Sequence, residues 1–260
     1  MIEPQLSIVI PTRNRTEKVL ETIRLMQEIT EDQPIEILIG DNSETPYAWP
    51  TEGPVRGWHI PERGVPRAQN HLVAQARAPY VMAVADDFRL YRETVPTALK
   101  LMGTVPPKTI GIPFHYDLGV LPCHAYLVVP ETWVMSQDTF QGVGGMNERF
   151  VYGYADTELG YRALHSGYNL IALRGVCTIH AHVDDGTKKQ NMGEDYKKDE
   201  ALFFQLYQEQ FVAVANKYGQ LRDLSKPVPC LLHNTVTRSW KDEDFDPQPT
   251  PTPTEEVARG

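Results

Sequence analysis

Three short apolar runs, separated by helix-like segments, constrain the fold more than any other feature of the sequence. The runs span Leu6–Ile10, Ile35–Ile39 and Tyr80–Ala85, and each is followed at once by a proline, a Gly-Asp pair or an Asp-Asp pair. Between them, apolar residues recur at helical spacing within Val19–Ile29, and Pro66–Ala78 also has a helical pattern. Buried strands that alternate with helices are typical of a parallel sheet covered on both faces. In such sheets, ligands bind beyond the carboxyl ends of the strands.

The second half of the chain is less regular, but it contains further strand-like runs and two helical segments. The expected strands lie near Ile110–Phe114, Ala125–Val129, Asn169–Leu173 and Val176–Ile179. One helix is expected from about Thr157 to Ser166, with Gly167 as its C-terminal stop. A longer amphipathic helix is expected over Glu194–Tyr218.

The net charge of the chain is -9, and much of it lies at the C-terminal end. Residues 241–260 carry six acids and two bases, a net of -4, which leaves -5 for the first 240 residues. This balance argues against a general nucleic-acid binder, which needs a basic face. From about residue 242 the chain is acidic and then rich in Pro and Thr, so the sequence predicts a disordered tail.

The length of the apolar runs and the spacing of the cysteines indicate where in the cell the protein is located. None of the apolar runs approaches the roughly 18 residues that span a bilayer. The N-terminus has no basic region followed by an apolar stretch, as a signal peptide would. The three cysteines are widely and irregularly spaced, which favours free thiols in a reducing compartment. A cytoplasmic location without a transmembrane segment is the resulting expectation.

Acidic residues gather at the ends of the predicted elements. Asp41 follows the second strand, Asp86 and Asp87 follow the third, and Asp156 begins a helix. Adjacent aspartates after a buried strand need compensation, and Mg²⁺ or Mn²⁺ shared with a diphosphate would supply it. The alternatives are ordinary ones: a turn with capping acids at 86–87, and a helix-dipole partner at Asp156. His180, taken alone, is equally consistent with an ordinary histidine at a strand end.

Taken together, these segments resemble the family 2 glycosyltransferases of the GT-A fold. The stretches that carry the resemblance are Leu6–Arg15, Ile37–Ser43, Gly64–Asn70, Ala76–Asp87, Gly144–Phe150, Tyr154–Arg162 and Gly167 through the strand ending at His180. They occur in the family's order and cover about Leu6 to His182. The resemblance implies a Rossmann-like α/β/α sandwich with a mostly parallel central sheet and a helical C-terminal extension.

The resemblance also implies the domain organisation. Residues 1–225 would form the GT-A domain, with a nucleotide-sugar-binding half (1–105), an acceptor and catalytic half (106–193) and a C-terminal helix (194–225). Residues 226–260 would form an extension that ends in the acidic tail. Residues 183–260 match no part of the family pattern.

The same resemblance assigns roles to individual residues. Asp87 would bind Mn²⁺ or Mg²⁺ in place of the family's DxD motif, with His180 as a second ligand, and Asp156 would be the general base. The donor-binding residues would be Pro11, Thr12, Arg13, Arg15, Asp41, Arg67, Asn70 and Asp86, with Arg63 as an alternative to Arg67 at the phosphates. The family's base motif usually begins with Glu, and here Ala155 stands in that position.

Aromatic residues near the base offer faces for an acceptor sugar. Trp133, Tyr152 and Tyr154 are the candidates, although core packing is the commoner use of such side chains. The acceptor itself stays open between a glycan, a lipid-linked substrate, a protein and a nucleic-acid base. His182, Asp184 and Asp185 are predicted to lie in a surface loop or in a lid over the donor.

The predicted reaction is metal-dependent transfer of a sugar from a nucleotide-sugar, UDP-linked by family habit, to an acceptor hydroxyl with inversion. Two other functions remain open. A non-catalytic nucleotide- or carbohydrate-binding protein is favoured slightly by Ala155. A sugar nucleotidyltransferase is disfavoured because residues 11–18 lack the glycines of a triphosphate loop.

Overall fold

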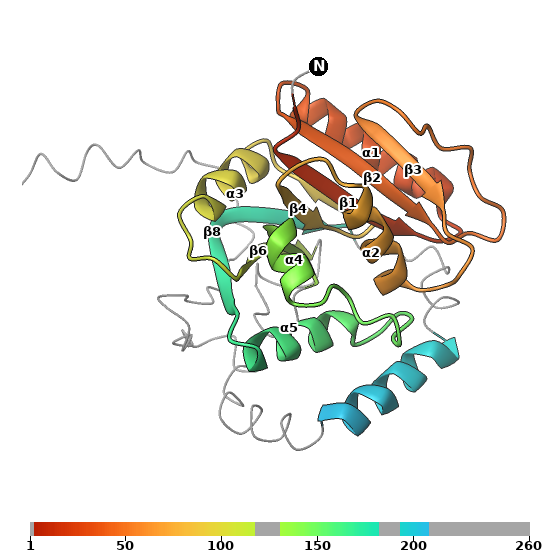
Figure 1. Cartoon of the computed structure of the whole chain (residues 1–260). Helices are drawn as coiled ribbons and strands as arrows, with labels where there is room; N and C mark the ends of the chain where they lie inside the picture. The colour runs from red at the N-terminus through yellow and green to blue at the C-terminus, as the bar shows by residue number, and fades with distance from the viewer. Residues whose placement is uncertain (1–2, 118–130, 182–192, 208–260) are drawn as a thin grey trace, which may run out of the picture.

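A single mixed sheet of eight strands organises the computed structural model, which describes residues 3–117, 131–181 and 193–207 (Figure 1). The strand order across the sheet is β3-β2-β1-β4-β7-β6-β8-β5. The strands are β1 (Leu6–Thr12), β2 (Ile35–Asp41), β3 (Val55–His59), β4 (Tyr80–Ala83), β5 (Phe88–Leu90), β6 (Thr109–Asp117), β7 (Trp133–Ser136) and β8 (Asn169–His180). The helices are α1 (Thr16–Thr30), α2 (Val65–Gln75), α3 (Thr94–Met102), α4 (Gln137–Gly142), α5 (Ala155–His165) and a further helix over residues 193–207.

The first half of the chain forms the parallel part of the sheet. β1 pairs in parallel with β2 and β4, and β2 pairs in parallel with β3. β7 joins this part to the second half through antiparallel pairs with β4 and β6, while β6 and β8 are again parallel. The predicted α/β sandwich with a mainly parallel sheet is therefore confirmed, and both halves of the chain share one sheet. The predicted domain boundaries themselves stay a prediction.

Alternating side chains on the strands build two cores. On β1, Ile8 and Ile10 pack into a cluster with α1 and α3, while Val9 packs into a second cluster with α2. β2 repeats the pattern, with Ile37 and Ile39 on one side and Leu38 on the other. Period-two alternation on strands buried from both sides gives this division because successive side chains point to opposite faces.

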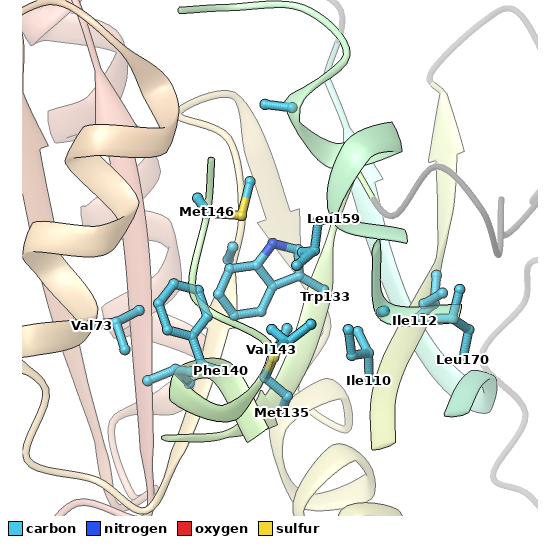
Figure 2. Close-up of a cluster of buried hydrophobic side chains, with 14 of the residues drawn as sticks. Val73, Ile110, Ile112, Trp133, Met135, Phe140, Val143, Met146, Leu159 and Leu170 are labelled. Atoms are coloured by element: carbon cyan, nitrogen blue, oxygen red, sulfur yellow. The ribbon is translucent and has the colours of Figure 1, made fainter. Parts of the chain in front are cut away.

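The second cluster continues into the other half of the sheet (Figure 2). Trp133 lies at its centre and stacks on Phe140 of α4, with ring centroids 5.4 Å apart. Leu159 of α5 and Phe203 of the 193–207 helix, both fully buried, close it from the outside. Helix α5 and the 193–207 helix therefore lie against each other over the same face of the sheet (Figure 1).

Several sequence expectations needed correction. The two strands expected at Asn169–Leu173 and Val176–Ile179 are one strand, β8. Its partner β6 pairs Pro113 with Leu173 and Phe114 with Cys177, so the residues between them form a bulge, and Gly175 has a φ of +80° there. In sequence, a bulge within one strand looks like a loop between two strands, because both place polar or glycine residues between apolar runs.

The remaining differences concern short elements. The strands β3, β5 and β7 and the helices α3 and α4 were not predicted. Helix α5 begins two residues earlier than expected, at Ala155, and its C-terminal stop at Gly167 is confirmed by a φ of +75°. The strand expected at Ala125–Val129, the loop with His182, Asp184 and Asp185, and residues 208–260 lie outside the described residues. No helix in the described part of the chain has the length and apolar character to cross a membrane.

Candidate active site

A cleft of about 480 Å³ opens at the carboxyl ends of β1 and β4. The end of β1, the turn after β4, the end of β8 and the loop before α5 all contribute to its walls. Twelve of the residues given a candidate role in the sequence line it: Pro11, Thr12, Arg13, Arg15, Arg63, Asp86, Asp87, Trp133, Tyr152, Tyr154, Asp156 and His180. Parallel strands bring these distant segments together because their carboxyl ends share one edge of the sheet.

Asp86 is held by the end of β1 and the start of α1. It is 5% exposed, and its Oδ2 accepts a hydrogen bond of 2.7 Å from Thr12 Oγ1. Its Oδ1 accepts from Arg15 Nη1. The Thr22 hydroxyl of α1 donates to the main-chain oxygen of Asp86 at 2.7 Å. These contacts fix the turn after β4 at the floor of the cleft.

Asp87 connects Arg15 with the end of β8. Its Oδ2 lies 3.3 Å from Arg15 Nη2, and its Oδ1 lies 3.4 Å from His180 Nε2. The His180 ring stacks on Phe88, with centroids 4.6 Å apart, and its orientation is thereby fixed. The Ala181 amide also donates to the Asp87 carbonyl at 3.0 Å. The positive charge of the Arg15 guanidinium thus partly compensates the buried Asp-Asp pair, and the His180 imidazole lies beside Asp87.

These side chains fit a divalent cation that is shared with a substrate. Within residues 3–117, 131–181 and 193–207, no cluster of three or more His, Cys, Asp or Glu side chains is arranged to hold a metal on its own. Mn²⁺ and Mg²⁺ are commonly bound by one or two carboxylates, with phosphate oxygens and water completing the shell. Asp87 and His180 supply such a partial set at the wall of the cleft.

Asp156 lies in the first turn of α5 and faces the cleft. Burial raises the pKa of its carboxyl, although the amide and hydroxyl of Thr157 donate to Oδ1 at 2.7 and 3.4 Å and partly offset that effect. A raised pKa makes a carboxylate a stronger base, which suits proton abstraction from a hydroxyl. Ala155, the departure from the family motif, is 4% exposed and packs in the core.

The three aromatic candidates differ in their surroundings. Burial raises the pKa of Tyr152, and the negative charges of Asp86 and Asp87 raise it further, so its phenol lies within electrostatic range of both. The Tyr154 hydroxyl donates to Glu200 Oε1 at 2.8 Å, and its ring contacts Tyr196 and Phe203. Trp133 is 1% exposed and is mainly a core residue, with little surface left for a sugar.

Three predicted donor-binding residues lie outside the cleft lining. Asp41 is fully buried, and its carboxylate accepts from the Ser43 amide at 2.9 Å and from Trp49 Nε1 at 2.9 Å. Asn70 donates to the Met146 carbonyl at 2.9 Å and accepts from the Met146 amide at 2.8 Å. Arg67 pairs with Glu148 at 3.1 Å on the surface. In this structure all three are engaged with other parts of the protein.

Hydrogen bonds also control the charge of Asp41. Burial would raise the pKa of its carboxyl, but the hydroxyl and amide of Ser43, the Trp49 indole and the Tyr47 amide together hold that pKa below its usual range. Asp41 therefore fixes the 41–49 segment beside β2, and a role toward a nucleobase stays a prediction.

Sequence reasoning missed residues on the outer side of the cleft. Tyr196, from the 193–207 helix, lines it. Arg63, the alternative to Arg67 in the sequence prediction, also lines the cleft and pairs with Asp195 of the same helix at 2.6 Å. Asp199 of the same helix is 2% exposed and accepts hydrogen bonds from the loop before α5. The amphipathic pattern predicted the helix, but periodicity alone does not say which loop its polar residues meet.

Comparison with known proteins gives a family match over part of the chain and a fold. Residues 7–124 match the family model described as Glycosyl transferase family 2. A comparison with curated proteins found no significant match. The family match covers β1 to β6 and includes Asp86 and Asp87, while Asp156 and His180 lie beyond it.

Three solved structures illustrate the structural likeness. Mannosyltransferase PcManGT from Pyrobaculum calidifontis, in complex with GDP-Man and Mn²⁺, superposes with a TM-score of 0.55 at 15% identity, covering 75% of this chain and 62% of that one. GalNAc-T7 with UDP, GalNAc and Mn²⁺ gives 0.57 at 12% identity, covering 70% and 44%. S. aureus TarS 1–349 gives 0.55 at 13% identity, covering 80% and 74%. The chain thus spans less than two thirds of the first two proteins, and at this identity the likeness concerns the fold.

Proposed function

We propose that the protein transfers a sugar from a nucleoside diphosphate to an acceptor hydroxyl, because residues 7–124 match the model of glycosyl transferase family 2 and the fold resembles that of solved glycosyltransferases. The observation that carries the proposal is the meeting of Asp86, Asp87, His180 and Asp156 in one cleft at the carboxyl ends of β1 and β4. Two relatives of the same fold were solved with a nucleotide or nucleotide-sugar and Mn²⁺, which supports this class of donor.

The donor diphosphate is proposed to lie over Asp87 and His180. A divalent cation held by these two side chains would neutralise the negative charge that develops on the departing diphosphate. Arg15 already touches both carboxylates, and its guanidinium fork is suited to phosphate oxygens. Arg13 and Arg63 line the same cleft and add positive charge near the phosphates.

Asp156 is proposed as the general base. Its carboxylate faces the cleft, and burial raises its pKa, so it can accept the proton of an acceptor hydroxyl as attack on the anomeric carbon begins. Attack from the side opposite the leaving group inverts the anomeric centre in a single displacement, with no covalent intermediate on the protein. Tyr152 is proposed to contact the reacting groups because its phenol lies near Asp86 and Asp87.

The acceptor is proposed to enter beside the loop before α5. Tyr152, Tyr154 and Tyr196 line this side of the cleft and present aromatic faces of the kind that pack on sugar rings. We therefore favour a carbohydrate acceptor over a protein or nucleic-acid base. UDP-linked sugars are the first donors to test and GDP-linked sugars the second, since both nucleotides occur among the structural relatives.

Calorimetric titration of UDP, GDP and their sugars, with and without Mn²⁺, tests the donor site. We expect one nucleotide series to bind in a Mn²⁺-dependent manner and Asp87→Ala to weaken that binding by at least about 10-fold. Asp32→Ala is the matched control, because Asp32 forms a surface pair with Arg92 far from the cleft. If no nucleotide binds at any Mn²⁺ concentration, or if both variants bind like the wild type, the donor-site assignment is wrong.

A further inference from the structure

The 193–207 helix holds the loop before α5 through one buried carboxylate. Asp199 is 2% exposed, and its oxygens accept hydrogen bonds from three successive main-chain amides. The amides of Val151, Tyr152 and Gly153 lie 3.1, 2.7 and 2.9 Å from these oxygens. Three consecutive N–H groups that converge on one anion form a nest, an arrangement that fixes the main chain around the bound charge.

The same helix supports a strained residue directly after that nest. Tyr154 has a φ of +56°, in the left-handed region that a bulky residue adopts only under constraint. Its hydroxyl donates to Glu200, and its ring contacts Tyr196, Phe203 and Phe204. Each of these four partners lies on the 193–207 helix. The strained conformation at the start of α5 is therefore maintained from outside the loop.

Close packing removes the remaining freedom of the loop. A Cβ atom on Gly153 would lie 2.6 Å from the Tyr196 ring, so the loop and the helix approach each other as closely as a glycine permits. On the other side, the Val65 amide of α2 donates to the Val151 carbonyl at 2.8 Å. The loop is thus held between α2 and the 193–207 helix at Val151 and Gly153, five and three residues before Asp156.

We propose that Asp199 is a positioning residue for the acceptor side of the active site. By binding the amides of 151–153, it fixes where Tyr152 and the first turn of α5 lie relative to Asp86 and Asp87. This rests on the proposed function, in which Asp156 is the base and Tyr152 contacts the reacting groups. Asp199 itself acts only through the loop, and the donor side of the cleft, built on β1, α1 and β8, does not depend on it.

The substitution Asp199→Asn tests this proposal in the full-length protein. The amide replaces one acceptor oxygen by an N–H donor, which faces main-chain donors and cannot bind all three of them. We expect amide hydrogen exchange of residues 150–154 to become faster. We also expect the kcat for hydrolysis of the nucleotide-sugar, with the donor that the wild type binds, to fall by about 10- to 100-fold. The dissociation constant for the free nucleotide and the KM for the donor should stay within about 2-fold, because a loop shift changes the reacting geometry and leaves donor binding intact.

Two further variants control the experiment. Glu194→Gln is the matched control on the same helix: Glu194 is exposed and pairs with Lys198 at 3.5 Å, so this variant should behave like the wild type. Gly153→Ala places a Cβ atom against the Tyr196 ring of the same helix, which displaces the loop without changing Asp199, and it should reproduce the loss of kcat with donor binding retained. This second variant keeps the test decisive if Asp199→Asn fails to fold.

The outcomes separate this proposal from the proposed function. Unchanged exchange and unchanged kcat in Asp199→Asn would overturn it, and so would an equal loss of nucleotide affinity and kcat, which indicates general structural damage. If wild type neither binds nor hydrolyses any nucleotide-sugar, the proposed function fails. Faster exchange at 150–154 in Asp199→Asn but not in Glu194→Gln would in that case still support the control of the loop by Asp199.

Discussion

The proposed role of Asp156 conflicts with its surroundings, because a general base has to be ionised while burial favours the neutral carboxyl. Burial raises its pKa above the ordinary value of 3.8, and the hydrogen bonds from Thr157 only partly counter this. The ionised carboxylate is therefore an energetic cost to the folded protein at neutral pH. The same cost makes it a stronger base toward an acceptor hydroxyl.

The first residue-scale prediction concerns Asp156→Asn. We expect kcat for transfer or donor hydrolysis to fall by about 10²- to 10⁴-fold, because the amide cannot accept the proton. The melting temperature should rise at the same time, since the amide removes a partly buried charge and keeps an oxygen for the Thr157 amide. Initial rates and calorimetric melting measure the two effects. Asp138→Asn, at the first turn of α4 and exposed, should change neither.

The pH profile gives a second residue-scale prediction. Because Asp156 acts when deprotonated, kcat should fall as the pH drops through its raised pKa, so the acid limb should lie above pH 3.8. A profile of kcat against pH between 4 and 8, at saturating donor, measures this. A limb at or below 3.8 would mean that burial does not govern this carboxyl.

At the residue scale, sequence reasoning succeeded where strand ends decide the geometry. Thr12, Asp86 and His180 converge because they end β1, β4 and β8 or follow them directly. Side-chain direction is harder to predict. Asn70 stays a predicted donor-binding residue, and in this structure its amide group contacts the Met146 main chain. The position of a residue in a motif predicts where its main chain lies in the fold. It does not predict which side-chain contacts the residue makes, because the contacting residues can come from distant parts of the chain that carry no motif.

At the scale of elements, β1 and β2 are joined by a buried polar cluster as well as by their ladder. Glu36 of β2 is 2% exposed and accepts 2.7 Å hydrogen bonds from Ser7 of β1, from the Arg77 amide and from Arg56 of β3. Burial alone would raise the pKa of Glu36, but these donors together hold it below its usual range. Three strands and the end of α2 thus share one carboxylate.

The element-scale prediction is that Glu36→Gln destabilises the sheet. Arg56 is 4% exposed, and removing its ionic partner leaves a buried positive charge, so the free energy of unfolding should fall by about 3–5 kcal/mol. Urea denaturation at pH 7 measures it. Glu28→Gln, which removes the surface pair with Arg24, should cost no more than about 0.5 kcal/mol. Equal effects in the two variants would contradict a special role of the buried cluster.

The sequence predicted the long central strands of the sheet but not its short strands. Apolar runs identified β1, β2 and β4 because each strand is covered on both faces and therefore has apolar residues at most of its positions. β5 has three residues and β7 four, too few for a period to emerge. Their place comes from pairing with β8 and β4, which only the folded chain reveals.

At the scale of the whole molecule, buried acids of opposite behaviour set the response of stability to pH. Glu36 and Asp41 have lowered pKa values, so their contributions to stability are complete above the ordinary values of 4.5 and 3.8 and are lost as the pH falls through the folded-state values. Asp156 has a raised pKa, so its protonation on acidification relieves a cost and favours the folded state. The two effects act over different windows, with that of Asp156 at the higher pH.

The whole-molecule prediction follows from that separation. The extra stability of Asp156→Asn over wild type should be greatest near pH 7, should begin to shrink as the pH falls through the raised pKa of Asp156, and should vanish only below the ordinary value of 3.8, where the unfolded wild type is protonated as well. Below about pH 4.5 the two proteins should lose stability together as Glu36 and Asp41 are protonated. Urea midpoints of both proteins from pH 3.5 to 7.5 measure the difference. A difference that is independent of pH would show that the ionised carboxylate at 156 carries no cost, and it would remove the physical basis for treating Asp156 as a base strengthened by burial.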